Sequence, residues 1–449
     1  MSHSPRKQSS GYSRRDFIKT SAVVGAGLAA GHGLAEVKTD TLAVSGGAKT
    51  VTFSDAEQHK LFRWPRYGEE EKKAVCAVLD LDGSELYAPL KPFETEWKKY
   101  LNVPFVKSHF NGTSALASMY FGLDLPPGSE VMVPSYTFFA TIVPMRHFGL
   151  VPIFVDINPK TGCFDLEDAK RRLTPNTRAM VPMHAWGMPC DMDQINDFAK
   201  EKGLVVVEDA AHAHGASLKG KKMGAWGDNA IFSFQGSKPL PVLEGGMGVY
   251  QKRETFERAT IFGHYEEAPS FPKESSYAGY TMTGLGLKLR IHPVGAALGS
   301  VRLRGLDKCN ADTRKRVRQI NDRLLQLPGI SEPYCRPDAE RVYYSVNRLH
   351  LEQAKAGFSR NAMLKALTAE GVKATPGDYT QQHKFKIYSE AKWWHHAPSI
   401  PKGDLPGCAQ CNQTSFCLPL FYEDAPELMD QHVKAFEKVW AHRNDIAKL

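Results

Sequence analysis

The chain has 449 residues, of which 42% are hydrophobic and 24% charged, which is enough for one large domain with a smaller companion. Its formal net charge is +8, and half of this excess lies in residues 1–35. The rest of the chain is therefore only weakly basic and has no basic stripe interleaved with aromatic residues, so we expect no nucleic-acid partner.

The N-terminal residues have the pattern of an export signal. SRRDFIKT (13–20) places two adjacent arginines before a short, glycine-rich apolar run that ends in small residues at Ala35. This is typical of a twin-arginine signal peptide over 1–35 and predicts a periplasmic or extracytoplasmic protein; the alternative is a disordered basic tail. The run is too short and too rich in glycine to span a bilayer, and no other segment is suitable, so we expect a soluble mature protein without stable membrane insertion.

The eight cysteines do not have the pattern of a disulfide scaffold in so long a chain. Cys408 and Cys411 form a single CxxC pair. A zinc site would need two further ligands, which neither a second CxxC nor an HxxxH supplies, so we expect no metal. For this pair, buried thiols are favoured over a disulfide, and a disulfide over a structural metal.

Residues 36–65 lack sustained periodicity and are expected to form an extended arm. A helix is predicted over 69–79, with acidic residues in its first turn. From about residue 100, short apolar runs such as EVMVPS, VPIFVDI and LVVVEDA alternate with helix-like segments. Strands that are apolar on both faces suit a mostly parallel sheet covered by helices, so we predict a large, doubly wound α/β domain over 66–305.

The pattern changes past about residue 305. Two helix-like segments, RKRVRQINDRLLQL and SRNAMLKALTAEG, flank a strand-like run, VYYSVNRLHL. A final helix is predicted over APELMDQHVKAFEKVW. These elements predict a smaller α+β domain over 306–449.

Polar groups follow two of the predicted strands, which is where functional groups collect in an open parallel sheet. In NGTSAL, the residues Gly112, Thr113 and Ser114 begin a helix with free N–H groups and hydroxyls, a pattern that suits an anion but is also an ordinary helix cap. In VVVEDAAHAHG, a buried strand leads to Asp209 and His212. A carboxylate there needs a partner such as a protonated heterocyclic nitrogen, unless it only caps a helix.

A third stretch, FSFQGSKPLPVLEGG, places Lys238 after a predicted strand that carries Ser233, and its last two glycines allow close backbone approach. A lysine that is desolvated there becomes nucleophilic; the alternative is a surface lysine. With Phe138 as an aromatic ring for stacking, the three stretches supply what pyridoxal 5′-phosphate requires. These requirements are a lysine for attachment, a carboxylate for the pyridinium nitrogen and a phosphate cradle.

At these residues the chain resembles the DegT/DnrJ/EryC1/StrS family of sugar aminotransferases, which are pyridoxal-phosphate enzymes of fold type I. The resemblance runs from about Trp64 to the end, through NGTSAL, PSYTFFAT, VPIFVDI, MHAWGMPCDMDQI, VEDAAHAHGA, GDNAIFSFQGSK and EGGMG in that order. The FSFQ…K…EGG and WPRYGEEE stretches look most like the branch that includes glutamine:scyllo-inosose aminotransferases. The resemblance implies a homodimer with shared active sites.

The resemblance also implies a role for each matching residue. Lys238 would form the Schiff base with the cofactor and move the proton between Cα and C4′. Asp209 would pair with the pyridinium, His212 would hydrogen-bond the phenolic oxygen, and Phe138 would stack on the ring. The phosphate would be held by Thr113, Ser114 and Ser233, at the helix that begins with Gly112.

One position departs from the family pattern. The family has a Gly-x-Asn-x-Arg run whose asparagine reaches the phosphate in the partner subunit, and here GLKLR places Lys288 at the asparagine's position. Lys288 either serves the phosphate as a point charge or signals a changed acceptor pocket. Some relatives have histidine in place of the lysine and act as dehydratases, so the retained Lys238 favours transamination.

The leading hypothesis is an aminotransferase that moves an amino group from glutamate or glutamine to a keto-sugar or keto-cyclitol in a ping-pong cycle. The alternative is a non-catalytic cofactor- or sugar-binding protein of the same fold. The export signal motivates this alternative, because nucleotide-linked sugars are expected in the cytosol. The joint presence of Lys238, Asp209 and His212 favours the enzyme.

Overall fold

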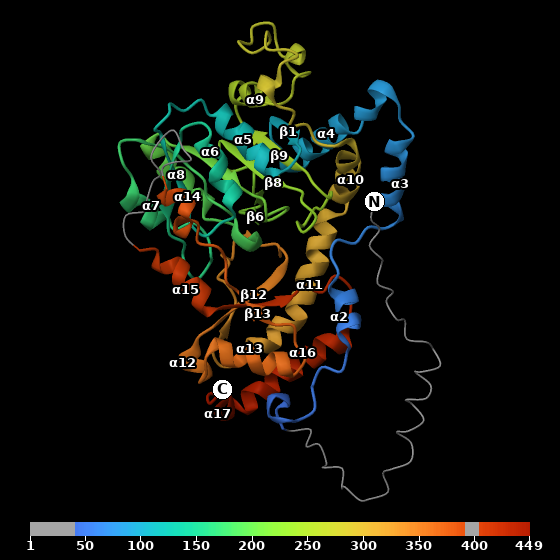
Figure 1. The fold of residues 1–449 in the computed structure, drawn as a ribbon, viewed down its shortest axis with the longest axis vertical. Coiled ribbons are helices and arrows are strands. Elements are labelled where there is room, and N and C mark those ends of the chain that lie inside the picture. The colour runs from blue at the N-terminus through green and yellow to red at the C-terminus, as the bar shows by residue number, and fades with distance from the viewer. Residues whose placement is uncertain (1–40, 391–403) are drawn as a thin grey trace, which may run out of the picture.

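The computed structural model describes residues 41–390 and 404–449, so the predicted export signal lies outside the described residues. The chain forms an upper, larger domain and a lower, smaller one, and α10 (Pro293–Arg304) and α11 (Leu306–Leu324) run from the first into the second (Figure 1). Among the described residues, no helix has the length and apolarity that a membrane crossing requires.

The large domain is built on a seven-stranded sheet with the order β1-β9-β8-β5-β4-β2-β3. The strand β9 is antiparallel to both of its neighbours, and the other pairings are parallel. The strands are β1 (Phe105–His109), β2 (Glu130–Pro134), β3 (Val151–Val155), β4 (Thr177–Met180), β5 (Val205–Asp209), β8 (Asn229–Ser233) and β9 (Gly246–Tyr250). The predicted α/β class and mostly parallel sheet are therefore confirmed.

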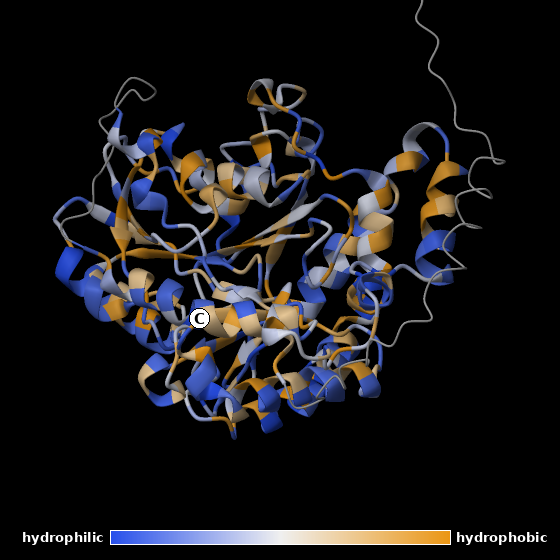
Figure 2. Cartoon of the chain, turned by 60° about the horizontal axis from the view of Figure 1, so that its bottom comes forward, coloured by the Kyte–Doolittle hydropathy of each residue, from blue (hydrophilic) through white to orange (hydrophobic). Residues whose placement is uncertain are grey.

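Helices cover both faces of this sheet. As a result, successive residues of one strand are buried in different cores. On β5, Val207 packs in the cluster that holds α5 and α6, whereas Val206 packs in the cluster that holds α8. The helices of the large domain are α3 (Glu69–Leu79), α4 (Leu90–Leu101), α5 (Gly112–Gly122), α6 (Val143–Arg146), α7 (Leu166–Arg172), α8 (Met192–Lys202), α9 (Arg253–Ile261) and α10. The helix predicted over 69–79 is confirmed as α3. Figure 2 shows hydrophobic residues concentrated along the central strands.

The small domain has a four-stranded sheet with the order β10-β12-β14-β13, in which every pair is antiparallel. Its strands are β10 (Ile330–Ser331), β12 (Val346–Leu351), β13 (Thr375–Pro376) and β14 (Ser415–Pro419), and its helices are α11, α12 (Gln353–Ala356), α13 (Arg360–Ala369), α15 (Pro406–Thr414), α16 (Pro426–Ala441) and α17 (Arg443–Ile446). A third, antiparallel sheet joins β6 (Ser217–Leu218), β7 (Lys221–Lys222) and β11 (Ala339–Glu340). The strand predicted over VYYSVNRLHL is shorter than expected, because Ser345 adopts a positive φ of 64° and interrupts it.

The N-terminal arm packs with the small domain although it precedes the large one in sequence. Leu42 and Val51 belong to the small-domain core, and the buried carboxylate of Glu370 accepts hydrogen bonds from the backbone N–H groups of Ala43 (2.7 Å) and Thr50 (3.0 Å). The arm is not extended throughout, in contrast to the expectation from the sequence, because it contains the helix α2 (Asp55–Phe62), which begins at a capping box on Ser54 and lies beside α16 in Figure 1. The arm is therefore an integral part of the small-domain core.

In the opposite sense, a C-terminal segment packs on the large domain. The backbone N–H of Gln382 donates to the Ser135 carbonyl (2.8 Å), and α14 (Lys386–Ser389) brings Tyr388 into the core beside α5. The carboxylate of Asp156, just after β3, accepts from the backbone N–H groups of Gly407 (2.6 Å) and Cys408 (2.8 Å) at the start of α15. Each domain thus includes chain that the sequence order assigns to the other.

Candidate functional site

A cavity of about 490 Å³ lies where β5 and β8 end and α5 begins. Seven of the nine predicted site residues line it: Gly112, Thr113, Phe138, Asp209, His212, Ser233 and Lys238. Ser114 and Lys288 do not. The three stretches that the sequence predicts to act together therefore meet in space, at the carboxyl ends of parallel strands.

The floor of the cavity depends on two close backbone approaches. A Cβ on Gly246 would lie 2.4 Å from the Asn111 carbonyl oxygen, and a Cβ on Gly112 would lie 2.8 Å from the Cβ of Ser233. Only glycine at both positions lets β9, β8 and the first turn of α5 come this close. The first turn of a helix has N–H groups without intrahelical acceptors, so Gly112, Thr113 and Ser233 form a cradle suited to an anion.

Ser114 is engaged elsewhere, in the cap of α5. The Asn111 side chain accepts from the Ser114 backbone N–H (2.8 Å), and the Ser114 hydroxyl accepts from the Asn111 backbone N–H (3.0 Å). The same hydroxyl donates to the Asn111 carbonyl (2.8 Å). The structure therefore gives this serine the ordinary capping role that the sequence left open.

Asp209 is 3% exposed and points into the cavity from the end of β5. One carboxylate oxygen accepts from the Thr141 hydroxyl (2.7 Å), and the other from the backbone N–H of Ala211 (3.1 Å). In the part of the chain that the structure describes, no cationic side chain forms an ion pair with it. A buried carboxylate is stabilised by a cation, and a protonated pyridine nitrogen would supply one here.

Its neighbour Glu208 faces the opposite side of the sheet and has a structural role. This carboxylate is fully buried and accepts from the backbone N–H groups of Gly224 (2.8 Å), Trp226 (2.6 Å) and Gly227 (2.7 Å), and from His184 Nε2 (3.0 Å). It fixes the turn that precedes β8. The two adjacent acidic residues of the sequence thus lie in different surroundings, Glu208 bonded to the turn and Asp209 lining the cavity.

His212 is buried in the cavity wall. Burial, and then the charge of Lys238 and the nearby His214, lowers its pKa well below the usual value, so the imidazole is neutral at physiological pH. Its Nδ1 accepts a long hydrogen bond from the backbone N–H of Trp186 (3.4 Å). The proton is therefore on Nε2, which is a hydrogen-bond donor.

Lys238 lies in the turn after β8. Its Nζ donates to the Tyr344 hydroxyl (3.2 Å) and lies 4.3 Å from the centre of that ring. Its carbonyl oxygen accepts from the indole N–H of Trp64 (3.1 Å). The amine is thus held inside the cavity, in contrast to a snorkelling surface lysine.

Phe138 lies at the margin of the cavity, and Lys288 lies away from it. Phe138 is 51% exposed, and its ring centre is 4.3 Å from that of Phe139. Lys288 belongs to the loop that leads into α10, with Nζ 6.0 Å from the centre of the Tyr265 ring. The structure therefore does not bring Lys288 to the cavity of its own chain.

Several further residues line the cavity, and the sequence analysis gave no role to those that contact the predicted groups most closely: Thr141, Trp186, Tyr344 and Tyr379. Trp186 lies in the quoted stretch MHAWGMPC and has a positive φ of 55°, a rare conformation for a bulky residue and therefore a local signal of function. Tyr344 and Tyr379 come from the far end of the chain, where no local pattern separates them from ordinary packing residues.

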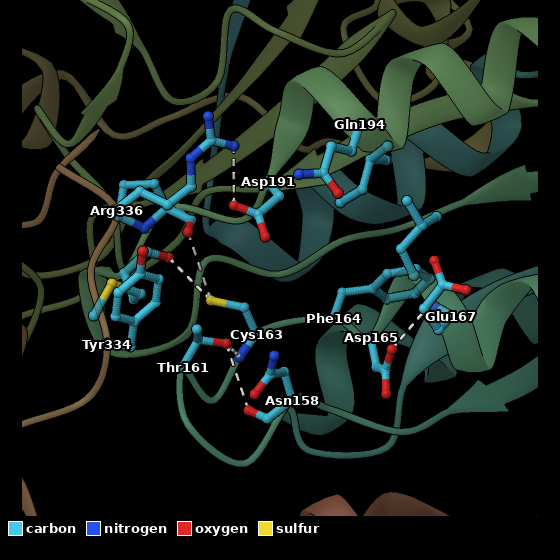
Figure 3. Close-up of a pocket in the computed structure, with 14 residues that line it drawn as sticks. Asn158, Thr161, Cys163, Phe164, Asp165, Glu167, Asp191, Gln194, Tyr334 and Arg336 are labelled. Atoms are coloured by element: carbon cyan, nitrogen blue, oxygen red, sulfur yellow. Dashed lines mark hydrogen bonds and ion pairs between the residues drawn. The ribbon is translucent and has the colours of Figure 1, made fainter. Parts of the chain in front are cut away.

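A second, smaller cavity of about 150 Å³ lies between the segment after β3 and the start of α8 (Figure 3). Its only lining cation among the described residues, Arg336, is already paired with Asp191 (3.2 Å) and with the neighbouring Asp193 (2.8 Å). The Cys163 thiol donates to the Met188 carbonyl (3.4 Å). We assign no ligand to it.

The larger cavity has the donor set that pyridoxal 5′-phosphate requires. A lysine amine, a buried carboxylate that has no ion pair within the described ranges, a neutral imidazole donor and a glycine-lined helix N-terminus surround one space. No group of three or more His, Cys, Asp or Glu side chains within 41–390 and 404–449 is arranged to hold a metal ion. These residues fit the cofactor that the sequence predicts.

Comparisons with known proteins support the resemblance to this aminotransferase family. Residues 65–437 match the DegT/DnrJ/EryC1/StrS aminotransferase family, and residues 11–31 match the TAT (twin-arginine translocation) pathway signal sequence. The dTDP-4-dehydro-2,3,6-trideoxy-D-glucose 4-aminotransferase of Saccharopolyspora spinosa is 33% identical over 391 residues, covering 84% of this chain and 96% of the relative. A protein of Streptoalloteichus tenebrarius, provisionally named L-glutamine:3-amino-2,3-dideoxy-scyllo-inosose aminotransferase, is 30% identical over 344 residues, covering 74% and 79%.

Among solved structures, an aminotransferase from Psychrobacter cryohalolentis superposes with a TM-score of 0.76 at 25% identity, covering 85% of this chain and 99% of that one. The large and small domains therefore have the fold-type I architecture that the sequence predicts. The chain belongs to the DegT/DnrJ/EryC1/StrS aminotransferase family, whose members are pyridoxal-phosphate-dependent enzymes.

Proposed function

We propose that the protein transfers an amino group from glutamate or glutamine to a keto-sugar or keto-cyclitol. The observation that carries this proposal is the convergence of Lys238, Asp209 and His212 on one cavity, each with a hydrogen-bonding environment suited to its role. The names of the relatives, which act on a deoxysugar nucleotide or a cyclitol, support this acceptor class.

Each residue has a defined task in this proposal. Pyridoxal phosphate, when bound, supplies a ring that withdraws electrons from the carbon bearing the amino group. The Lys238 amine removes the proton from that carbon of the amino donor. In the second half of the cycle it delivers a proton to the corresponding carbon of the acceptor. The Asp209 carboxylate, oriented by Thr141, stabilises a protonated ring nitrogen, and His212 donates from Nε2 to an anionic ring oxygen.

The remaining residues hold and shield the cofactor. The N–H groups of Gly112 and Thr113 and the hydroxyl of Ser233 bind the phosphate, since they line the cavity at the N-terminus of α5. Phe138 covers one side of the ring and excludes water. Ser114 contributes by holding the cap of α5 in place.

The proposal includes a homodimer in which Lys288 reaches the partner's phosphate. It is supported by exposed apolar side chains on loops near the cavity and on the loop of Lys288, including Phe110, Leu243 and Leu287, which are 52%, 57% and 41% exposed. The Phe110 N–H donates to the Leu289 carbonyl (2.7 Å), so this loop lies against the end of β1. Sedimentation of the wild type and of Leu287→Asp tests the dimer, and a monomeric wild type would refute it.

The twin-arginine signal supports a further proposal, that the enzyme acts in the periplasm or another extracytoplasmic space. This route carries folded proteins, which suits an enzyme that binds its cofactor before export. The acceptor would then be a sugar or cyclitol available outside the cytoplasm.

The activity is tested with purified protein and cofactor, by following the absorbance of the bound cofactor as glutamate or glutamine is added. We expect a spectral shift in the wild type and in the control Lys221→Ala, and none in Lys238→Ala. Unchanged cofactor binding and half-reaction in Lys238→Ala would refute the role of this lysine. Tight sugar binding without turnover with any amino donor would favour the non-catalytic alternative.

A further inference from the structure

Tyr344 belongs to the small domain but lines the cavity of the large one. It precedes Ser345, whose positive φ of 64° accompanies a tight turn closed by the hydrogen bond from the Val346 N–H to the Tyr344 carbonyl (2.7 Å). For a residue other than glycine this conformation carries a conformational cost, and such costs are concentrated at functional sites. The turn ends the segment immediately before β12, so the tyrosine is attached to a rigid sheet.

The contacts of Tyr344 are with the proposed catalytic groups themselves. Its hydroxyl accepts from Lys238 Nζ (3.2 Å) and lies 3.2 Å from the Ser237 hydroxyl. Its ring stacks on the His212 ring, with centres 3.9 Å apart and planes at 28°, and also lies parallel to the Trp186 indole. One side chain therefore fixes the lysine amine and the histidine plane relative to each other.

A second aromatic residue holds the other end of Lys238. The indole N–H of Trp64, from the N-terminal arm, donates to the Lys238 carbonyl (3.1 Å). Trp64 is itself stacked on Tyr422 of the small domain, with ring centres 4.4 Å apart and planes at 24°. Both the backbone and the amine of Lys238 are thus held by residues outside the domain that carries it.

We propose that Tyr344 is a positioning residue for Lys238, assisted by Trp64, so that the amine is placed for proton transfer only while the small domain and the arm are docked. The inference rests on the proposed function insofar as it treats Lys238 as the reacting lysine. The Tyr344 hydroxyl accepts a hydrogen bond from the amine in both its neutral and its charged form. It can at the same time donate to Ser237, so Tyr344 neither gains nor loses a proton over the cycle.

The test uses the full mature chain freed of cofactor, so that it does not depend on transaminase activity. Reductive methylation with formaldehyde and a hydride donor, followed by peptide mass spectrometry, gives the modification rate of Lys238 relative to the exposed Lys72. Tyr344→Phe removes only the hydroxyl, and we expect Lys238 to react about threefold to tenfold faster, as the loss of one hydrogen bond implies. Trp64→Phe is expected to change the rate in the same direction.

Tyr343→Phe is the matched control, because the neighbouring tyrosine does not line the cavity, and its Lys238 rate should equal that of the wild type. In the loaded enzyme, Tyr344→Phe is expected to lower kcat about tenfold or more while KM for the amino donor changes little. A wild-type modification rate for Lys238 in Tyr344→Phe would overturn the inference, even in an active transaminase. A wild type that shows no spectral response to any amino donor would instead refute the proposed function and leave the labelling result intact.

Discussion

The adjacent carboxylates at the end of β5 should respond in opposite ways to the same chemical change. Glu208 accepts four hydrogen bonds on one face of the sheet, whereas Asp209 faces the cavity on the other. Converting each to its amide keeps the shape and removes the charge. We expect Glu208→Gln to lose stability and keep the cavity, and Asp209→Asn to keep stability and lose cofactor affinity.

The expected loss of stability in Glu208→Gln follows from the number of hydrogen-bond donors that would lose their acceptor. One Glu208 oxygen accepts from the Trp226 and Gly227 N–H groups, and the other from Gly224 N–H and His184 Nε2. His184 cannot change tautomer at no cost, because its Nδ1 accepts from the Cys190 N–H (3.1 Å). In either orientation, a glutamine amide therefore turns its NH₂ toward two donors. At about 1–3 kcal/mol for each unpaired buried donor, the expected loss is about 4 kcal/mol.

Asp209→Asn loses far less, because an asparagine oxygen still accepts from the Ala211 N–H and the Thr141 hydroxyl can reverse to accept from the amide. We expect a change in stability within about 1 kcal/mol. Without its negative charge, however, the site no longer pairs with a protonated ring nitrogen. The dissociation constant of the cofactor should then rise about tenfold or more.

Urea unfolding of the cofactor-free proteins at pH 7.5 measures the first effect, and spectroscopic titration with pyridoxal phosphate measures the second. The expected result is a much lower midpoint for Glu208→Gln only and weaker binding for Asp209→Asn only. If Glu208→Gln unfolds at the wild-type urea concentration, or if both variants lose the same stability, the assignment of the two carboxylates to different faces is refuted.

Other predictions concern pH, packing and export. Burial lowers the pKa of His432 to about 4, so between about pH 6.5 and 4 the unfolded chain binds a proton that the folded chain does not, and stability falls as the pH falls through this window. In urea titrations, the free energy of unfolding of His432→Phe should fall by about 1 kcal/mol less than that of the wild type between pH 7.5 and 5.5. Equal decreases in the two proteins would contradict this reasoning. Gly246→Ala would place a methyl group 2.4 Å from a backbone carbonyl oxygen, so it should cost about 3 kcal/mol, whereas Gly279→Ala, with open space, should cost little in the same titration. Lysine at both Arg14 and Arg15 should retain the protein in the cytoplasm, as cell fractionation would show; unchanged export would argue against the twin-arginine route.

Local sequence patterns predicted the mostly parallel sheet because its strands are buried on both faces and therefore read as apolar runs. The predicted strand positions also placed Asp209, Ser233 and Lys238 at or just after strand ends. Because the carboxyl ends of parallel strands lie at one edge of the sheet, these residues could be expected to lie close together. The sequence could not decide between a phosphate ligand and a cap for Ser114, because that choice depends on local contacts: the Asn111 side chain accepts from the Ser114 N–H, and the Asn111 backbone bonds the Ser114 hydroxyl.

The sequence did not reveal the parts of the site that depend on contacts between distant segments. Tyr344 looked like part of a regular strand, and only the positive φ of Ser345 in the structure shows that it leaves the sheet. The arm looked featureless in the sequence because the order of its described part, residues 41–65, comes from contacts with the small-domain core, in which Leu42 and Val51 are buried. Such contacts have no period along the chain.

The exchange of segments between the two domains limits how the protein can be re-engineered. A chimaera that took residues 306–449 from a relative would set the native arm, with Leu42 and Val51, against a foreign core. It would also ask a foreign α15 to be capped by the native Asp156. A graft intended to change acceptor preference must therefore include the arm of the same relative. It must also include the large-domain residues on which α14 and α15 pack, because otherwise both contacts join residues from different proteins.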